Sequence, residues 1–249
     1  MKALLKKLRT KWHNDINPNI NAKDAIVNDK LDAINDGLRF LMKHQIPLKQ
    51  EDELAFLFDR YISDKGSVYR TYVYRSRVHT YADVYHSLFS PIRQEVKAVF
   101  ECGIFRGGSL RAWRDYFKNA MIIAGDKEKR YLFEEDRIYT SLMDQMDKDS
   151  IVSFFKSLAP KYPDKFDIMI DDGCHIYEAT ICLFENAIQY LKSNGIYIIE
   201  DMLEKYFSSY EDFFKTYIDR GDIEVEYKNM VNKTGDPNNN LIIIKKVGK

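Results

Sequence analysis

The stretch "VKAVFECGIFRGGSLRAWRDYF" (96–117) decides the fold. An apolar run leads into a glycine-bearing loop, and apolar residues at helical spacing follow. This order predicts a strand over 96–103 and a helix over 107–117, joined by a loop that a ligand can approach closely. An ordinary β–α turn is the alternative, because the glycines at 103, 107 and 108 lack the G-x-G-x-x-G spacing of dinucleotide sites.

The same alternation of strands and helices continues to the end of the chain. Further strands are predicted over 120–126, 166–171, 195–201, 223–230 and 240–247, and helices over 151–159, 178–192 and 209–221. Alternating strands and helices form a parallel sheet that is covered on both faces. We therefore predict an α/β fold: a doubly wound, mostly parallel, seven-stranded, Rossmann-like sheet that closes with a C-terminal antiparallel strand pair. The turn "NKTGDPNN" (232–239) joins that pair.

Helical patterns precede the alternating region. They cover 21–46, 51–62 and 79–92. A chain of 249 residues suits one sizeable α/β domain with an appended element. We expect an N-terminal helical extension over 1–50 and the α/β domain over 51–249.

Composition and charge exclude several classes of protein. Hydrophobic residues make up 45%, and 38 basic residues balance 38 acidic ones, which argues against a nucleic-acid surface or a polybasic membrane anchor. The basic N-terminus has an apolar run too short for a signal peptide or a membrane span. Cys102, Cys174 and Cys182 have no metal-binding or redox spacing and read as reduced thiols of a cytoplasmic protein.

Two acidic positions after the glycine loop indicate an adenosine-type cofactor. Asp126 ends the second strand, where an acid in a doubly wound fold binds the hydroxyls of a ribose, although a lone aspartate there is usually a cap. Asp144, followed by Gln145, could accept a hydrogen bond from an adenine amine. Asp147 and Asp149 are at least as well explained as helix N-caps.

Four carboxylates follow two neighbouring strands. "DIMIDDGCHIYEAT" (167–180) carries Asp171 and Asp172, and "GIYIIEDM" (195–202) carries Glu200 and Asp201. Ligands of open parallel sheets bind at the carboxyl ends of strands, and converging carboxylates repel unless a cation such as Mg²⁺ binds them. His175 suits a general base at the same edge, against the alternative of a structural histidine. A Cys174 nucleophile has little support, because no orienting residue is apparent.

The ordered set of motifs resembles a known family. It comprises E-x-G-x-x-x-G-G-S (101–109), Asp126, D-D-G-x-H (171–175) and I-E-D (199–201). It resembles the class I S-adenosylmethionine-dependent methyltransferases, and more narrowly the metal-dependent sugar O-methyltransferases related to those that act on macrolide deoxysugars. The resemblance covers roughly 53–205, and Asp172 and Glu200 are 28 residues apart, as the metal site of that family would place them.

The resemblance implies a role for each matching residue. S-adenosylmethionine would bind at Lys65, Glu101, Gly103, Ser109, Asp126, Asp144, Gln145 and Asp171; Asp172, Glu200 and Asp201 would ligate Mg²⁺; and His175 would be the catalytic base. The sequence departs from the family at Cys174, where serine is common, and at "KSNG" (192–195), where a Pro-Gly-Gly turn is common. The first 50 residues match nothing that we can assign.

The acceptor is inferred less directly. The residue bias is typical of an AT-rich bacterial genome and favours a nucleotide-activated sugar, such as a heptose, for a surface or capsular polysaccharide. The alternatives are a natural product or other small molecule and, from another class, a non-catalytic or hydroxylase-like relative that binds a ligand on the same fold. We expect a small-molecule sugar or nucleotide-sugar substrate, a homo-oligomer, no nucleic-acid partner and no membrane span.

Overall fold

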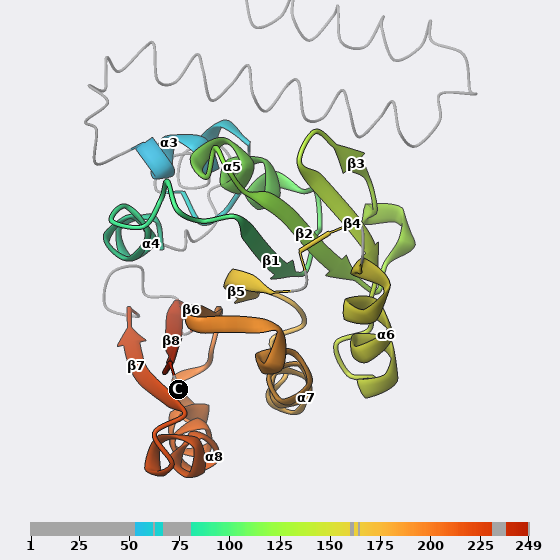
Figure 1. The fold of residues 1–249 in the computed structure, drawn as a ribbon. Helices are drawn as coiled ribbons and strands as arrows, with labels where there is room; N and C mark the ends of the chain where they lie inside the picture. The colour runs from blue at the N-terminus through green and yellow to red at the C-terminus, as the bar shows by residue number, and fades with distance from the viewer. Residues whose placement is uncertain are drawn as a thin grey trace, which may run out of the picture. The chain divides into compact units, whose positions relative to one another are not determined.

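The computed structural model describes residues 53–61, 63–66, 81–159, 162–163, 165–230 and 238–248. The expected N-terminal extension (1–50), the helix over 21–46 and most of the turn at 232–239 lie outside these residues. Figure 1 shows the described elements as a mixed α/β fold.

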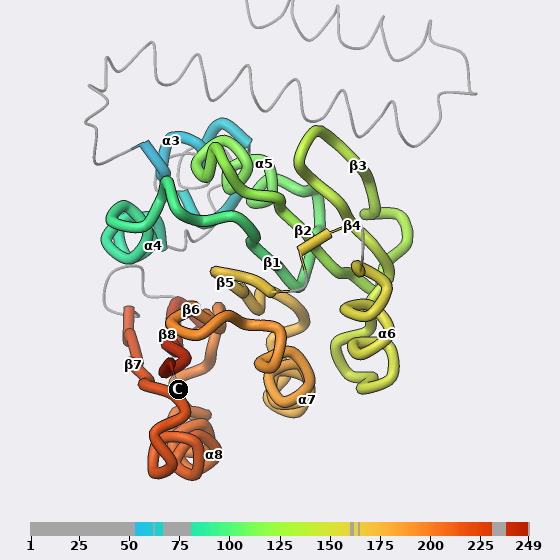
Figure 2. The backbone as a smooth tube through the Cα atoms, viewed as in Figure 1, coloured from blue at the N-terminus to red at the C-terminus, as the bar shows by residue number. Residues whose placement is uncertain are grey.

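A mixed sheet forms the centre of the described residues, and its backbone path can be followed in Figure 2. The strand order is β3-β4-β2-β1-β5-β6-β8-β7. The strands are β1 (Ala98–Cys102), β2 (Met121–Asp126), β3 (Glu134–Glu135), β4 (Ile138–Leu142), β5 (Phe166–Asp171), β6 (Leu191–Ile199), β7 (Ile223–Asn229) and β8 (Asn240–Lys246). Strands β4, β2, β1, β5 and β6 pair in parallel, whereas β8 pairs antiparallel with β6 and β7. The predicted doubly wound sheet with a C-terminal antiparallel pair is confirmed.

Helices cover both faces of the sheet (Figure 1). They are α3 (Glu53–Arg60), α4 (Ala82–Phe89), α5 (Gly108–Tyr116), α6 (Lys148–Leu158), α7 (Tyr177–Ala187) and α8 (Phe207–Asp219), with 3₁₀ turns at Lys129–Tyr131, Ile188–Tyr190 and Glu204–Tyr206. Helices α3, α4 and α5 share one apolar cluster, and α6, α7 and α8 share the other. These two clusters bury the apolar faces of the strands and fix the strand ends that carry the acidic residues.

Aromatic contacts hold each helical layer together. On one face the Trp113 ring lies 4.8 Å from the Phe58 ring and 5.3 Å from the Tyr85 ring. On the other, Phe184 lies 5.4 Å from Tyr197 and 4.9 Å from Phe214 in edge-on geometry. Edge-on pairs of this kind add about 0.5–1.5 kcal/mol beyond area burial.

The structure differs from the sequence prediction at two places. Strands β3 and β4 fall between 127 and 150, where no strand was placed, and they bring the described strands to eight. Strand β6 begins at Leu191 rather than at 195, because helix α7 ends at Ala187 and Leu191 pairs with Phe166.

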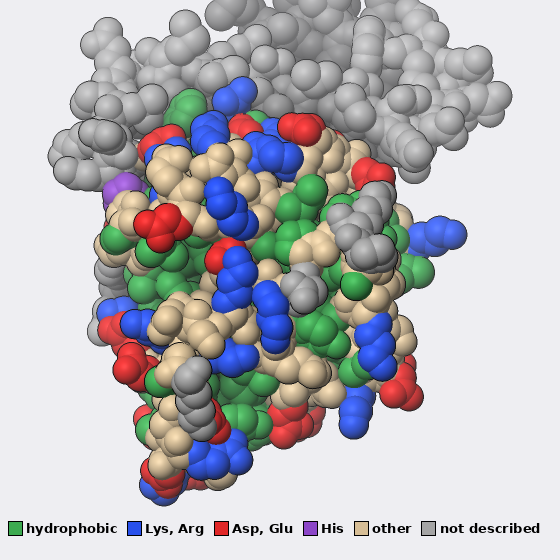
Figure 3. All heavy atoms as spheres, in the orientation of Figure 1, with side chains coloured by type: hydrophobic (Ala, Val, Ile, Leu, Met, Phe, Trp, Pro, Cys, Tyr) green, Lys and Arg blue, Asp and Glu red, His purple; other side chains and the backbone are tan. Residues whose placement is uncertain are grey.

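On the face drawn in Figure 3, the described residues present both basic and acidic side chains. None of the described helices combines the length and the apolar character that a membrane span requires.

Candidate active site

The acidic residues lie at the carboxyl ends of adjacent parallel strands. Asp126 ends β2, Asp171 ends β5, and Glu200 directly follows β6. The backbone N–H of Asp172 donates to the Cys102 carbonyl, and the N–H of Glu200 donates to the Asp171 carbonyl. These bonds continue the sheet pairing beyond the strands, so that the acids of β5 and β6 share one edge, as predicted.

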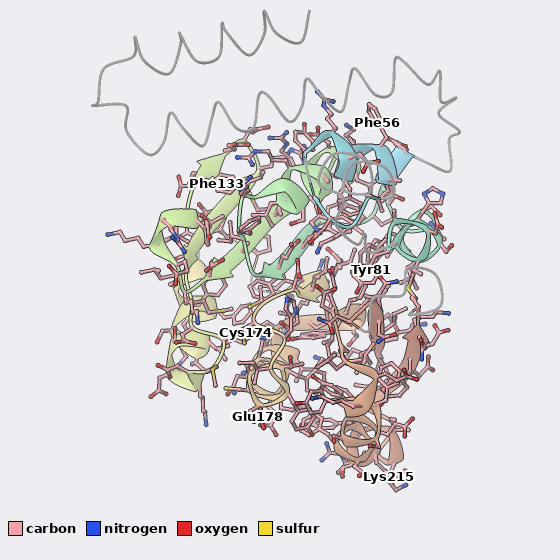
Figure 4. All side chains as sticks on the ribbon, turned by 180° about the vertical axis from the view of Figure 1, so that it is seen from behind. Phe56, Tyr81, Phe133, Cys174, Glu178 and Lys215 are labelled. Atoms are coloured by element: carbon pink, nitrogen blue, oxygen red, sulfur yellow. The ribbon has the colours of Figure 1, made fainter. Side chains whose placement is uncertain are left out.

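A cavity of about 250 Å³ opens at this edge. It is lined by Cys102, Gly103, Gly125, Asp126, Lys127, Met143, Asp144, Gln145, Met146, Gly173 and Cys174. Four predicted cofactor residues are among them: Gly103, Asp126, Asp144 and Gln145. Figure 4 shows Cys174 in the loop between the sheet and α7.

Glycine is required where β1 ends. Gly103 has φ +92°, and a Cβ there would lie 2.0 Å from the backbone oxygen of Asp172. A side chain at this position would therefore push the β1 loop away from the β5 loop. The close approach of the two loops forms the floor of the cavity.

Asp126 both supports the glycine loop and faces the cavity. Its Oδ2 accepts a hydrogen bond from the Ile104 N–H at 2.9 Å, and its Oδ1 accepts one from the Glu128 N–H at 2.8 Å. The capping alternative and the ligand-binding prediction are thus compatible here. For Asp147 the capping alternative is confirmed, because its carboxylate accepts from the N–H groups of Asp149 and Ser150 at the start of α6.

Gln145 lines the cavity and connects it to Asp171, the acid at the end of β5. Its Nε2 donates to Asp171 Oδ1 at 2.6 Å, and its Oε1 accepts from the Cys174 N–H at 3.0 Å. Burial raises the pKa of Asp171 to about 6. Asp171 is only 2% exposed, so it supports the cavity through Gln145 instead of lining it.

Glu101 and Ser109 lie beneath the glycine loop. The Ser109 hydroxyl donates to Glu101 Oε1, and the indole N–H of Trp113 donates to Oε2, both at 2.5 Å. Glu101 is fully buried, and this burial raises its pKa to about 7. The pair does not line the cavity, although the resemblance placed both residues at the cofactor.

Three side chains converge beside the cavity. Asp172, His175 and Asp201 each offer one ligand atom, and these atoms all lie within 4.8 Å of one another. His175 Nε2 is 3.9 Å from Asp172 Oδ1 and 3.8 Å from Asp201 Oδ2. His175 and Asp201 both have φ +56°, a left-handed conformation that Asn, Asp and His adopt more often than other residues with a side chain.

Glu200 and Lys65 form the buried side of this cluster. Lys65 Nζ lies 2.5 Å from Asp172 Oδ2 and 2.6 Å from Glu200 Oε2. The Tyr85 hydroxyl donates to Glu200 Oε1 at 2.5 Å, so both oxygens of Glu200 are engaged. The resemblance placed Lys65 at the cofactor, but the structure places its ammonium group between two of the predicted metal ligands.

Burial and neighbouring charges shift the pKa values of Lys65 and Glu200 in opposite directions. Burial tends to lower the pKa of Lys65, but Asp172, Glu200 and other acids together raise it well above its usual value. Burial also raises the pKa of Glu200 well above its usual range, and Lys65 opposes this effect. Lys65 therefore remains protonated, and its charge holds the two carboxylates together.

Two tyrosines of the aromatic segment before β1 were missed as site residues. The Tyr81 hydroxyl donates to Asp201 Oδ1 at 2.7 Å, and Tyr85 binds Glu200. Figure 4 shows Tyr81 next to α4. Their spacing of four residues predicts a buried helix face, and only the hydroxyl groups distinguish these positions from Phe89, one turn further along the same face.

The two carboxylates fit a hard divalent cation. Asp172 and Asp201 supply oxygen atoms, which Mg²⁺ prefers, and His175 Nε2 lies beside them on the exposed side. Glu200, predicted as a third carboxylate ligand, meets the same cluster from the buried side. The cavity and this cluster share the loop that follows β5, because Gly173 and Cys174 line the cavity between Asp172 and His175.

The strand order and the cavity at the carboxyl edge of the sheet agree with the class I methyltransferase fold that the resemblance implies. The chain matches no protein-family model. It is similar to sugar O-methyltransferases: 30% identical over 141 residues to the 8-demethyl-8-alpha-L-rhamnosyl tetracenomycin-C 2'-O-methyltransferase of Streptomyces olivaceus (54% of this chain, 36% of the relative). It is also 34% identical over 166 residues to the demethylmacrocin O-methyltransferase of Streptomyces fradiae (64% of this chain, 38% of the relative). The resemblance that the motifs indicated is confirmed.

A solved structure supports the same fold. The methyltransferase MycE of the mycinamycin biosynthetic pathway, in complex with Mg and SAH, superimposes with a TM-score of 0.61. Sequence identity is 24%, and the match covers 78% of this chain and 55% of that one. The chain spans less than two fifths of the length of the two curated relatives.

Proposed function

We propose that the protein is an S-adenosylmethionine- and Mg²⁺-dependent O-methyltransferase that acts on a sugar hydroxyl. One observation carries the proposal: the convergence of Asp172, His175 and Asp201 beside a cavity at the carboxyl edge of the sheet. Ligands of such sheets bind at this edge. A cation site and a base beside a cavity at this edge suit transfer of a group to a hydroxyl.

Different residues of the cavity would contact different parts of the cofactor. Asp126 would bind the ribose hydroxyls, and Asp144 would face the adenine amine. Gly103 keeps the floor free of side-chain atoms, and Gln145 holds the wall against Asp171. Glu101 and Ser109 act from beneath the loop, since neither reaches the cavity surface.

His175 acts as the base. When bound, the cofactor supplies the methyl group, and the divalent cation held by Asp172, Asp201 and Glu200 makes a sugar hydroxyl more acidic. His175 Nε2 lies on the exposed side of the carboxylates, where it can accept the proton of that hydroxyl.

The relatives favour one acceptor class over the other. Both named relatives act on natural products, and one of them is named for a rhamnosyl group. This similarity supports a deoxysugar of a natural product, the alternative in the sequence prediction, better than a nucleotide-activated sugar for a polysaccharide. The homo-oligomer, the absence of a nucleic-acid partner and the cytoplasmic location stay predictions.

Methyl transfer from labelled S-adenosylmethionine tests the proposal. The acceptor panel pairs glycosylated polyketides that carry a free deoxysugar hydroxyl with nucleotide-sugars. We expect transfer to the glycosides, its loss in EDTA and its recovery with Mg²⁺. Full activity in EDTA would remove the metal from the mechanism, and the lack of a thermal shift with S-adenosylmethionine would favour a non-catalytic relative.

A further inference from the structure

Lys65 is the only buried lysine or arginine in the part of the chain that the structure describes, with 1% of its surface exposed. Its ammonium group lies within 2.6 Å of both Asp172 and Glu200. A buried ammonium ion is unfavourable unless anions surround it closely. The two carboxylates, Asp172 and Glu200, are therefore what allows the ammonium group of Lys65 to be buried at this position.

The backbone beneath Lys65 is fixed to helix α3. The Ser63 N–H donates to the Phe58 carbonyl at 2.9 Å, and the Lys65 N–H donates to Ser63 Oγ at 3.4 Å. A Cβ on Gly66 would lie 2.3 Å from Asp59 Oδ1, so the loop packs closely on the helix end. These contacts fix the backbone at Lys65, so that its side chain extends from a fixed point to the two carboxylates.

The lysine engages the carboxylate oxygens that a cation would also need. Glu200 Oε2 contacts Lys65, and Glu200 Oε1 accepts from Tyr85. Asp172 Oδ2 contacts Lys65 as well, which leaves Asp172 Oδ1 on the side of His175. A cation bound to Glu200 Oε2 and Asp172 Oδ2 would share these oxygens with the Lys65 ammonium group, and the two positive charges would repel each other.

We propose that Lys65 is an internal counter-ion that competes with the divalent cation for Asp172 and Glu200. It holds the two carboxylates together when no cation is bound, and it gives up Glu200 when the cation binds. The inference rests on the metal requirement of the proposed function. Lys65 is then a positioning residue that sets the affinity of the site for the cation, and it takes no part in proton transfer.

Isothermal titration with MgCl₂ alone, without cofactor or acceptor, tests this role. We expect Lys65→Met to bind Mg²⁺ about tenfold more tightly than the wild type or better, since removal of only about 1.4 kcal/mol of competition gives that factor. Lys192→Met is the matched control, because Lys192 Nζ pairs with Asp167 Oδ1 at 2.7 Å outside the cluster. This control should bind Mg²⁺ as the wild type does.

The outcomes separate the two proposals. No Mg²⁺ binding by the wild type would overturn the metal requirement and this inference with it. Binding that is equal or weaker in Lys65→Met would overturn this inference alone.

A second measurement uses the wild-type protein, in case Lys65→Met does not fold. Lys65 should react faster with an amine-acetylating reagent when Mg²⁺ is present, as followed by mass spectrometry with Lys192 as the internal reference. Unchanged or slower labelling of Lys65 would contradict its release.

Discussion

Substitution of Glu101 by glutamine should change how stability depends on pH. Burial raises the pKa of this carboxyl from its usual 4.5 to about 7, even though the hydroxyl of Ser109 and the indole of Trp113 donate to it. A raised pKa in the folded state means that Glu101 favours folding most when it is protonated. That contribution is complete below pH 4.5 and is lost as pH rises through about 7.

The size of the effect follows from the shift in pKa. Each pKa unit corresponds to about 1.4 kcal/mol, so the shift of Glu101 amounts to about 3 kcal/mol. Glutamine is never charged, and its amide can bond both Ser109 and Trp113. We expect Glu101→Gln and the wild type to be similarly stable near pH 4.5, and the variant to be more stable by up to about 3 kcal/mol above pH 7.

Urea unfolding at a series of pH values measures this difference. Comparison of the two proteins in the same buffers cancels the titration of the groups that do not interact with Glu101. Glu134→Gln, a change at an exposed carboxyl, is the control and should show no such trend. A difference in unfolding free energy that is constant from pH 4.5 to 8 would refute the reasoning, because it would mean that Glu101 is not held neutral by burial.

Three further substitutions test the site. Gly103→Ala should abolish binding of S-adenosylhomocysteine in calorimetry, because its Cβ would lie 2.0 Å from the Asp172 oxygen; retained affinity would argue against the close approach of the loops. Tyr85→Phe should lower the unfolding free energy by about 1–3 kcal/mol, since Glu200 loses a buried donor, and a smaller loss would mean that water replaces it. His175→Ala should reduce kcat about 10²- to 10⁴-fold while the affinity for S-adenosylhomocysteine is kept. Unchanged turnover would exclude His175 as the base.

Continuous apolar runs made the central strands predictable. All five residues of β1 are buried, as are the last four of β5, so apolar character alone identifies them. The sequence does not predict strand β4, because only Ile138 and Thr140 of its five residues are buried and Thr140 and Ser141 interrupt its apolar character. A half-buried strand beside the short outer strand β3 lacks the apolar run that marks a central one.

The sequence predicts only those site residues whose positions follow directly from the ends of the strands. The ends of β5 and β6 fix where the four acids lie, and adjacent parallel strands must bring those ends together. The contact of Lys65 with Asp172 could not be predicted in this way. Lys65 lies 107 residues before Asp172 in the sequence, in the loop that follows α3. No local pattern encodes such a contact, and packing of α3 and α4 on the sheet decides it.

The two acids of each strand-end pair, Asp171–Asp172 and Glu200–Asp201, differ in how deeply they are buried. In each pair the first acid is buried and bonded by protein groups: Asp171 by Gln145, and Glu200 by Lys65 and Tyr85. The second acid, Asp172 or Asp201, also has a protein partner, Lys65 or Tyr81, but it stays partly exposed and faces His175. Each doublet thus places one buried and one partly exposed carboxylate at this edge of the sheet. The doublets are therefore better explained as halves of one site than as turn residues.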